Sequence, residues 1–418
     1  MLGWEIPPFI SVGLGTACYG LTKAMDRLGV NITFVLPRAC AGQHAEHVSL
    51  LSTQGSIRPY SEFKNVRFRA VASPLRPYSP SGTSQAHAGT HQAWTKAGTA
   101  WGWQWAQNPA HYGGNMLEDV TRYADTVARI AQFESFDVIH AHDWMTYPAG
   151  MLVAKQTGRP LIVHVHSTEF DRSGEHVNQP IYDIERAGMH AADKVIAVSN
   201  YTKNILISRY AVNPDKVEVV YNGVDSMDEK YEQMLPAKDD RIVLFLGRIT
   251  MQKGPEYFLA AAKKVLEKID NVRFVMAGEG DMLHRIIELA AQIGIGSKVV
   301  FTRFLRGPDV DAIFRMADLY VMPSVSEPFG IAPLEAMQRD VPVLISRQSG
   351  VAEVLNHVLK VDFWDINQMA NKIIAVLRYA PLRAALRQNG RFEVRRFRWE
   401  DAAAKIVRLY EQMVPCPA

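Results

Sequence analysis

The sequence is poor in cysteine: its 418 residues include only three, Cys18, Cys40 and Cys416. Three cysteines so far apart cannot on their own form a disulfide framework or a four-ligand zinc site, which favours a reducing compartment. The sequence also lacks an excess of either charge, because 46 basic residues oppose 43 acidic residues and the net charge is +3. This balance gives no reason to expect nucleic acid as a partner.

Long apolar runs are absent as well. No stretch approaches the roughly 20 apolar residues that a membrane-spanning helix needs. The amino-terminal segment MLGWEIPPFISVGLG has no basic region, and Glu5 and two prolines interrupt any apolar run, so a signal peptide is not expected. We therefore expect a cytoplasmic protein.

The length exceeds the size at which a single hydrophobic core stops growing, so two domains of roughly 200 residues are expected. Short β-branched runs alternate with helical segments, a pattern typical of parallel, doubly wound α/β sheets. The strands predicted in the first half are 2–4, 32–36, 66–71, 138–141, 161–165, 195–198 and 217–221. The helices predicted between them include 16–28, 117–133, 180–192 and 201–209.

The strand-helix pattern restarts after a polar connector at 225–240, which places a domain boundary at about residue 226. The strands predicted beyond the connector are 242–246, 272–277, 299–301, 319–322 and 341–345.

Residues 73–115 interrupt this pattern with prolines, glycines and four tryptophans, Trp94, Trp101, Trp103 and Trp105. A loop of roughly 40 residues is often a lid or binding loop, and its aromatic rings could stack on sugars. The alternative is a partly disordered insertion whose tryptophans pack on the domain.

The strongest chemical motif is SEPFGIAPLEAM at 326–337, which follows the predicted strand 319–322. Ligands of open α/β sheets bind beyond the carboxyl ends of strands, which is where Glu327 falls. Gly330 lets the backbone approach a ligand and leaves helix amino-terminal amides to face an anion. Glu335 lies inside the helix, and two carboxylates in one cleft suit a hydroxyl-rich ligand. The alternative is that Glu327 caps the helix and Glu335 is a solvated surface charge.

A second motif, GRITMQKG at 247–254, places Arg248 and Lys253 in a strand-to-helix turn. Two cations there can neutralise a diphosphate leaving group, Arg as a planar fork and Lys as a movable point charge. The alternative is a solvated pair of surface charges.

Further motifs are AGEGD at 277–281, NGVD at 222–225, HAHDW at 140–144 and VHVHSTEF at 163–170. Together the motifs resemble the retaining GT-B glycosyltransferases of family 4, on the side nearest glycogen and starch synthases. They lie in order over nearly the whole chain and leave only the 73–115 insertion uncovered.

The resemblance implies two Rossmann-like domains whose parallel sheets face each other across a cleft. Residues 1–225 would form the acceptor domain and residues 226–396 the nucleotide-sugar domain, with a final helix at about 397–418 packing back on the first. The implied reaction moves a hexosyl group, with glucose the expected sugar, from a UDP- or ADP-sugar to an acceptor hydroxyl with retention of configuration. The acceptor would be a glucan, an oligosaccharide or a small molecule, and no metal or other cofactor is expected.

Residue roles carried over from the resemblance centre on four residues. Arg248 and Lys253 would bind the donor diphosphate, Glu327 would contact the transferred sugar, and His166 would lie near its C6 hydroxyl. Asp143 matches an acceptor-side carboxylate. The remaining donor contacts would be Gly13, Gly278, Glu279, Phe304, Leu305, Phe329, Gly330, Ile331 and Glu335.

One departure from the family pattern concerns the loop at 11–15. The family carries a Gly-Gly pair there, whereas this sequence has Val12 before Gly13. Valine does not adopt positive φ cheaply, so either the loop is rearranged or activity is reduced. Given Val12, a non-catalytic nucleotide-sugar-binding protein stays an alternative, and within the enzyme class the alternative is a nucleotide-sugar 2-epimerase or hydrolase of the same fold.

Several other patterns in the sequence do not indicate a site by themselves. His140, His142 and His164 alternate with apolar residues as a metal cluster would, but no acidic ligand set accompanies them. Read without the family, His166 at a strand end is more often structural than catalytic.

The run from Gly13 to Cys18 begins like a dinucleotide fingerprint but lacks its third glycine. Asp309 and Asp311 could pass for a metal-binding carboxylate pair, but a helix start with Asp309 as its cap is favoured.

The last pattern is a basic stripe, Arg383, Arg387, Arg391 and Arg395, which Gly390 could interrupt. Such stripes are usually solvated, and docking to an anionic membrane or a polyanionic acceptor is the minor alternative because no broad apolar face accompanies this one. The sequence does not indicate an oligomeric state.

Overall fold

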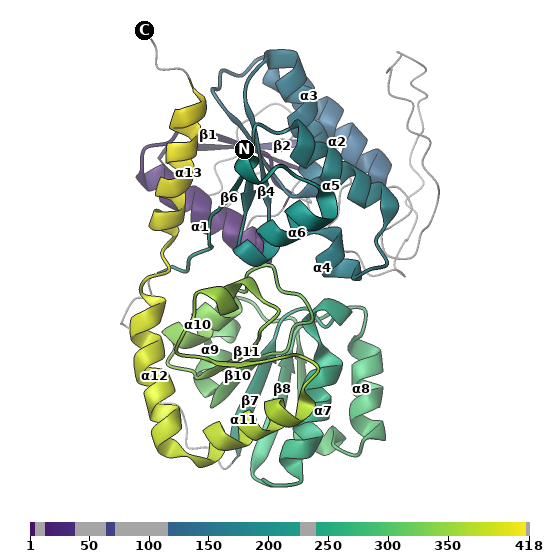
Figure 1. Ribbon diagram of the computed structural model, residues 1–418, viewed down its shortest axis with the longest axis vertical. Helices are drawn as coiled ribbons and strands as arrows, with labels where there is room; N and C mark the ends of the chain where they lie inside the picture. The colour runs from purple at the N-terminus through teal and green to yellow at the C-terminus, as the bar shows by residue number, and fades with distance from the viewer. Residues whose placement is uncertain (5–12, 38–63, 72–115, 226–239, 415–418) are drawn as a thin grey trace.

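The computed structural model describes residues 1–4, 13–37, 64–71, 116–225 and 240–414 (Figure 1). The predicted insertion at 73–115, Val12 and most of the polar connector at 225–240 lie outside these residues, as does residue 226, where the domain boundary is predicted. The chain forms two α/β halves, one above the other in Figure 1, each built around a parallel sheet. The predicted fold class is confirmed.

The sheet of the amino-terminal half is wound outward in both directions from Leu2. Leu2 pairs with Val35 on one side and with Ala141 on the other, so it joins a two-stranded part to a four-stranded part. The predicted strand at 2–4 is therefore reduced to a single bridging residue. The strands are β1 (Ile32–Pro37), β2 (Val66–Val71), β3 (Ile139–His142), β4 (Leu161–Val165), β5 (Lys194–Ala197) and β6 (Val217–Val219).

Helices cover both faces of this sheet. Apolar residues of α1 and α13 pack with Phe34, Ile162 and Ile196 on one face, while α2, α3 and α5 pack with the alternate strand residues on the other. The helices concerned are α1 (Gly13–Arg27), α2 (Met116–Ala131), α3 (Tyr147–Thr157), α4 (Glu169–Ser173), α5 (Gln179–Ala191), α6 (Asn200–Tyr210) and α13 (Trp399–Met413).

The carboxy-terminal sheet has six parallel strands in the order β12-β11-β10-β7-β8-β9. The chain winds from β7 to β9 in one direction, returns, and winds from β10 to β12 in the other. The reversal creates a topological switch point between β7 and β10. The strands are β7 (Arg241–Leu246), β8 (Val272–Ala277), β9 (Val299–Arg303), β10 (Leu319–Met322), β11 (Val343–Ser346) and β12 (Leu359–Val361).

Two apolar layers enclose this second sheet. One layer contains residues of α7, α8 and α11, and the other contains residues of α9 and α10. The helices are α7 (Pro255–Leu266), α8 (Leu283–Gln292), α9 (Pro308–Met316), α10 (Ala332–Gln338), α11 (Ile366–Arg378) and α12 (Ala380–Val394). Short 3-10 turns complete the chain as η1 (Trp144–Thr146), η2 (Pro214–Lys216), η3 (Met251–Lys253), η4 (Gly296–Lys298) and η5 (Gly350–Glu353).

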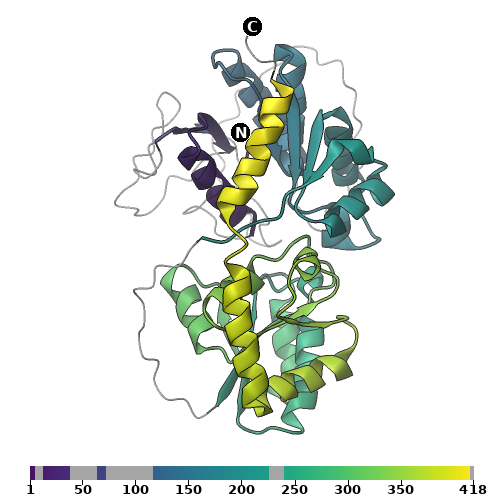
Figure 2. The ribbon, with the colours of Figure 1, turned by 60° about the vertical axis from the view of Figure 1, so that its left-hand side comes forward.

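The chain returns to the amino-terminal half at its end, where α13 follows α12 (Figure 2). Val224 N donates to the carbonyl of Phe397 at 3.0 Å, so the two connections between the halves run side by side. Trp399 then packs on α1, where a methyl group at Gly20 would lie 2.2 Å from its indole nitrogen. Glycine is therefore needed at position 20 to let the last helix dock.

Among the described residues, no helix is both long and apolar enough to cross a membrane.

Candidate functional site

Lys253 and Glu327 meet at the switch point of the carboxy-terminal sheet. Lys253 ends η3 after β7, and Glu327 lies in the loop after β10. The Nζ atom of Lys253 is 2.5 Å from Oε2 of Glu327, although the two residues are 74 positions apart. The structure therefore brings the predicted phosphate-binding cation and the predicted sugar-contacting carboxylate together where doubly wound sheets bind ligands.

Glu327 is held firmly in this position. The residue is 7% exposed, and Ser324 Oγ donates to the same carboxylate oxygen at 3.2 Å. Its backbone N donates to Gln348 O at 3.0 Å, and its carbonyl accepts from Gly350 N at 2.9 Å. The interpretation of Glu327 as a helix cap is wrong, because α10 starts at Ala332 with Ile331 as its N-cap residue.

Arg248 is the second cation of this region. It is half-buried, and its guanidinium donates to Oε1 of Gln252 at 3.2 Å. The buried Gln252 also accepts through its carbonyl from Val325 N at 2.9 Å, which ties η3 to the Glu327 loop. A guanidinium and an ammonium on one turn can hold two phosphate groups at once.

Gly330 turns the chain from the Glu327 loop into α10. Its φ of 103° lies where residues with a side chain are strained, and a methyl group would lie 3.2 Å from Met322 Cε. Phe329 beside it is 2% exposed and packs in the core, so only its backbone can face a ligand. Glu335 lies in the first turn of α10, where burial raises the pKa of its carboxyl and the nearby Arg339 opposes the rise.

The ends of β7 and β8 approach each other closely beside this loop. A methyl group at Gly278 would lie 1.9 Å from the carbonyl oxygen of Gly247, and φ of Gly278 is 146°. Glu279 is exposed, and its carbonyl accepts from Ile249 N at 2.8 Å. Only glycine at 278 permits this backbone contact.

Phe304 and Leu305 follow β9 at the same edge of the sheet. Phe304 is 37% exposed, and the guanidinium carbon of Arg306 lies 5.2 Å from its ring centroid. Leu305 is half-buried against the core. An exposed ring there is free to stack on a planar group.

In the amino-terminal half, Asp143 lies beneath the turn that carries His166. Asp143 is 3% exposed and has φ of 57°. Its Oδ1 accepts from the backbone N of His166 at 2.7 Å and from Ser167 N at 3.4 Å. Burial raises the pKa of this carboxyl to about 7, and the two backbone hydrogen bonds oppose the rise. Asp143 therefore orients the His166 backbone.

His166 follows β4 and is half-buried. Its Nε2 lies 3.0 Å from Nδ1 of His142. Burial lowers the pKa of His166 to about 3, so the imidazole is neutral at physiological pH. A neutral imidazole can accept or donate one hydrogen bond to a sugar hydroxyl.

The segments carrying His166 and Glu327 contact each other across the two halves. Ser326 Oγ donates to Oδ1 of Asp171 at 2.5 Å. Asp171 belongs to a capping box with Thr168 at the start of α4, directly after His166. Sequence reasoning missed Asp171, although the Thr168-to-Asp171 spacing is that of a capping box.

A second contact between the halves surrounds Pro328. Its carbonyl accepts from Ser199 Oγ at 2.5 Å and from Thr202 Oγ1 at 3.2 Å, both at the start of α6. Nothing in the sequence pattern singled out Ser199 or Thr202. The carboxyl edges of the two sheets therefore face each other.

Two sequence expectations need correction. Gly13 is the exposed first residue of α1, so the helix begins three residues earlier than predicted, inside the expected glycine loop. Asp309 does not cap α9, because Gly307 holds that position and no side chain caps the helix. Asp311 pairs instead with Arg315 at 2.6 Å and Arg339 at 2.7 Å.

Gly390 does not interrupt the helix, because α12 runs to Val394; Arg383, Arg387 and Arg391 lie on it, and Arg395 is its C-cap residue. Arg383 donates to Val376 O at 3.0 Å, and Arg391 lies 3.7 Å from Asp340. Part of the stripe therefore has partners within the protein, and the docking alternative stays a prediction.

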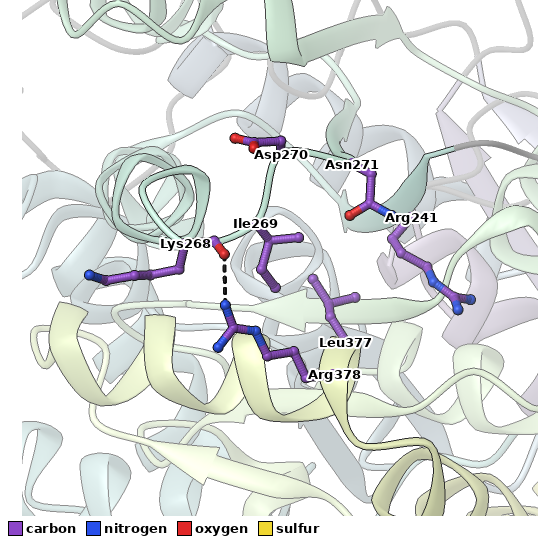
Figure 3. A pocket seen from close by; sticks show the side chains of 7 residues that line it. All are labelled: Arg241, Lys268, Ile269, Asp270, Asn271, Leu377 and Arg378. Atoms are coloured by element: carbon purple, nitrogen blue, oxygen red, sulfur yellow. Dashed lines mark hydrogen bonds between the residues drawn. The ribbon is translucent and has the colours of Figure 1, made fainter.

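A pocket between β7, β8 and α11 lies at the opposite edge of the carboxy-terminal sheet (Figure 3). It is lined by Arg241, Lys268, Ile269, Asp270, Asn271, Leu377 and Arg378. Arg241 and Asn271 lie at the amino ends of β7 and β8, whereas ligands of such sheets bind at the carboxyl ends. None of the predicted site residues lines this pocket.

Two doubly wound α/β halves with facing carboxyl edges define the GT-B class of glycosyltransferases, and the family comparisons agree. Residues 105–227 match Glycosyltransferase Family 4, and residues 226–392 match Glycosyl transferases group 1. The two matches are contiguous and cover most of the chain. The chain therefore carries both glycosyltransferase domains, and it is a glycosyltransferase of the GT-B fold.

Curated relatives carry related names. An uncharacterised glycosyltransferase of Methanocaldococcus jannaschii is 29% identical over 430 residues, which covers 98% of this chain and 97% of that protein. The glycogen synthase of Mycobacterium tuberculosis is 23% identical over 85% of this chain and 79% of its own length. The family resemblance read from the motifs is confirmed.

Solved structures show the same fold. Sucrose-phosphate synthase from Thermosynechococcus elongatus superposes with a TM-score of 0.75 and 20% identity over 98% of this chain and 97% of its own. Anabaena HepE in complex with UDP-glucose has a TM-score of 0.62 and 21% identity over 69% of this chain and 82% of its own. At these identities the likeness concerns the fold alone.

Proposed function

We propose that this glycosyltransferase moves a glucosyl group from UDP- or ADP-glucose to an acceptor hydroxyl, with retention of anomeric configuration. The acceptor would be a glucan, an oligosaccharide or a small molecule. The observation that carries the proposal is the contact between Lys253 and Glu327 at the switch point between β7 and β10.

The donor would lie along the carboxyl edge of the second sheet. Arg248 and Lys253 would bind the diphosphate, and Glu327 would bind hydroxyls of the transferred glucose. Glu335 would accept hydrogen bonds from the ribose, and the exposed ring of Phe304 would face the base. HepE, a protein of the same fold, has been solved with UDP-glucose, which supports this class of donor.

The leaving diphosphate gains negative charge as the sugar departs, so fixed cations beside it lower the barrier. Arg248 and Lys253 would supply that charge, and transfer would need no added divalent ion. His166 and Asp143, on the other half, would line the acceptor side. Contact of the two halves would exclude water, which otherwise hydrolyses the donor.

A thermal-shift panel tests the donor assignment. A ligand that binds the folded state raises the melting temperature by mass action, so UDP, ADP, GDP and their glucose conjugates can be ranked directly. We expect UDP or ADP and the matching glucose conjugate to give the largest shifts, without added magnesium. A shift that requires magnesium would contradict the metal-free binding of the diphosphate.

The same preparation separates the alternative activities. Incubation of the preferred donor without acceptor should leave it intact, whereas an epimerase or hydrolase would change it. With a panel of hydroxyl acceptors, proton NMR of the product should show the anomeric configuration of the donor. Binding of the donor without turnover on any acceptor would favour a non-catalytic protein.

A further inference from the structure

Four histidines lie stacked at the carboxyl ends of β3 and β4. The ring centroids of His140 and His142 are 4.3 Å apart, and those of His164 and His166 are 4.1 Å apart. Residues 140, 142 and 164 are at most 2% exposed. Side chains this polar are rarely found fully buried together without a strong reason.

The hydrogen bonds of the cluster leave two ring nitrogens unmatched. His140 Nε2 lies 3.3 Å from His164 Nδ1, and His142 Nδ1 lies 3.0 Å from His166 Nε2. His140 Nδ1 also bonds the hydroxyl of Tyr410 on α13 at 2.5 Å. Nε2 of His142 and Nε2 of His164 are buried and have no hydrogen-bond partner. Buried polar nitrogens are rarely left without a partner, so these two point to a missing ligand.

Cys18 adds a sulfur to this cluster from a distant part of the chain. It lies on α1, is fully buried, and faces the same side of the sheet. The possible ligand atoms of Cys18, His142 and His166 all lie within 4.8 Å of one another. The ligand atoms of His140, His142 and His164 form a second such group, which shares His142.

We propose that Cys18, His142 and His166 form a binding site for one transition-metal ion, with Zn²⁺ as the probe. Imidazole nitrogen and thiolate sulfur are the ligands that zinc prefers, and no carboxylate is needed. The absence of acidic ligands, which led the sequence reading to set a metal aside, is therefore no objection once Cys18 and His166 join the set.

Charge favours the group with Cys18 over the group of three buried histidines. A dication surrounded only by neutral imidazoles in an apolar core has no compensating charge, which is costly. A thiolate supplies one negative charge. His166 is also half-buried rather than fully buried, so the group it belongs to has a route for the ion to enter.

Binding would bring the three ligand atoms closer together than the 4.8 Å within which they now lie. Zinc-nitrogen bonds of about 2.0–2.1 Å and a zinc-sulfur bond of about 2.3 Å place tetrahedral ligand atoms roughly 3.3–3.7 Å apart. Nε2 of His142 is already without a partner, so an ion shared by His142 and His166 would break no hydrogen bond of that nitrogen. The rings of His140 and His164 stack on these two ligands and would fix their orientation, as neighbouring groups do in metal sites.

An ion at this position would tie α1 to the ends of β3 and β4. α1 lies more than 100 residues before these two neighbouring strands, so the ion would join distant parts of the chain. The site lies in the amino-terminal half, away from Arg248 and Lys253, and shares only His166 with the proposed acceptor side, so the inference does not depend on the proposed donor binding.

Metal content of the untagged, full-length protein tests the proposal. The protein is stripped with a chelator, loaded with zinc chloride, desalted and measured by mass spectrometry for zinc per chain. We expect close to one zinc per chain and a rise in melting temperature. Cys18→Ala and His142→Ala should each weaken zinc binding by at least about 100-fold, because even changes to groups behind the ligands cost about 10–100-fold.

His176→Ala is the matched control, because His176 is exposed and lies in the same half. It should retain the zinc of the unchanged protein. Circular dichroism of the zinc-free Cys18→Ala protein checks that the substitution leaves the fold intact.

X-ray absorption at the zinc edge tests the ligand set without any substitution. The first shell should contain imidazole nitrogens at about 2.0–2.1 Å and one sulfur at about 2.3 Å. A chain that keeps no zinc after desalting would overturn the proposal, and so would a first shell without sulfur.

Discussion

Replacing Lys253 by methionine removes the charge of the ammonium while keeping a side chain of similar length. The contact that is lost joins Lys253 Nζ to Glu327 Oε2 at 2.5 Å, and the two side chains are 20% and 10% exposed. Breaking a fully buried ion pair by removing one partner costs about 3–5 kcal/mol. Here Ser324 still donates to Glu327, and some water reaches the pair, so we expect a loss of about 1–3 kcal/mol in the free energy of unfolding.

The effect on transfer should be larger than the effect on stability. Removing one group that stabilises developing charge lowers kcat about 100- to 1,000-fold in well-studied enzymes. We expect a decrease of at least about 100-fold in the rate at which the nucleoside diphosphate is released.

A double variant separates the two effects. Lys253→Met combined with Glu327→Gln leaves no isolated charge, so most of the lost stability should return, because replacing both partners of a buried pair is often nearly neutral. Activity should not return. Unfolding in urea followed by circular dichroism gives the first quantity, and initial rates of diphosphate release give the second.

Lys264→Met provides the control, because Lys264 is an exposed lysine on α7 in the same half. Its free energy of unfolding should stay within about 0.5 kcal/mol of the unchanged protein. Full transfer activity in Lys253→Met would refute the assignment of the diphosphate site. Equal destabilisation of the single and double variants would refute the paired geometry.

Three further predictions concern the framework of the site. Gly278→Ala should abolish donor-induced thermal shifts, because a methyl group would lie 1.9 Å from Gly247 O; an unchanged shift would contradict the close approach of β7 and β8. Trp399→Ala should lower the free energy of unfolding by about 3–5 kcal/mol in urea titrations, because Trp399 is 4% exposed where α13 packs on α1. A loss below about 1 kcal/mol would contradict this docking. Burial tends to raise the pKa of the Asp311 carboxyl, but its partners Arg315 and Arg339 hold that pKa below 3.8. Asp311→Asn should therefore lower the free energy of unfolding by up to about 1 kcal/mol at neutral pH. Since the folded-state pKa is depressed, this difference should be present above pH 3.8 and vanish as the pH falls through the folded-state pKa; a difference that persists at low pH would contradict the linkage.

The carboxy-terminal part of the site was predictable because its residues are local to strand ends. Arg248 and Lys253 lie in the turn after β7, and Glu327 lies in the loop after β10. A sequence of alternating strands and helices already implies that such loops gather at one edge of a sheet. Their pairing needed only the strand order, which places β7 beside β10.

Other features depended on tertiary contacts that a linear pattern does not contain. Leu2 was predicted within a strand, but it pairs as a single residue, because only it reaches both Val35 and Ala141. The three-residue strand β12 is too short to carry a periodic signal and was not predicted. The approach of Cys18 to the histidines was not predictable either, since it reaches them from a helix more than 100 residues away.

His166 lies in the amino-terminal half and Glu327 in the carboxy-terminal half, so their relative position depends on contacts between the two halves. Asp143 adopts a positive φ, which costs free energy in a residue with a side chain, and its carboxylate accepts the backbone N of His166. Such a conformation persists only where the surrounding contacts determine it, and here the capping box of α4 follows at once. Asp171 of that box then binds Ser326, the neighbour of Glu327. Because the chain of contacts runs from the Asp143 turn through α4 to the Glu327 loop, His166 and Glu327 are positioned by one connected set of hydrogen bonds, and neither half alone can establish their arrangement.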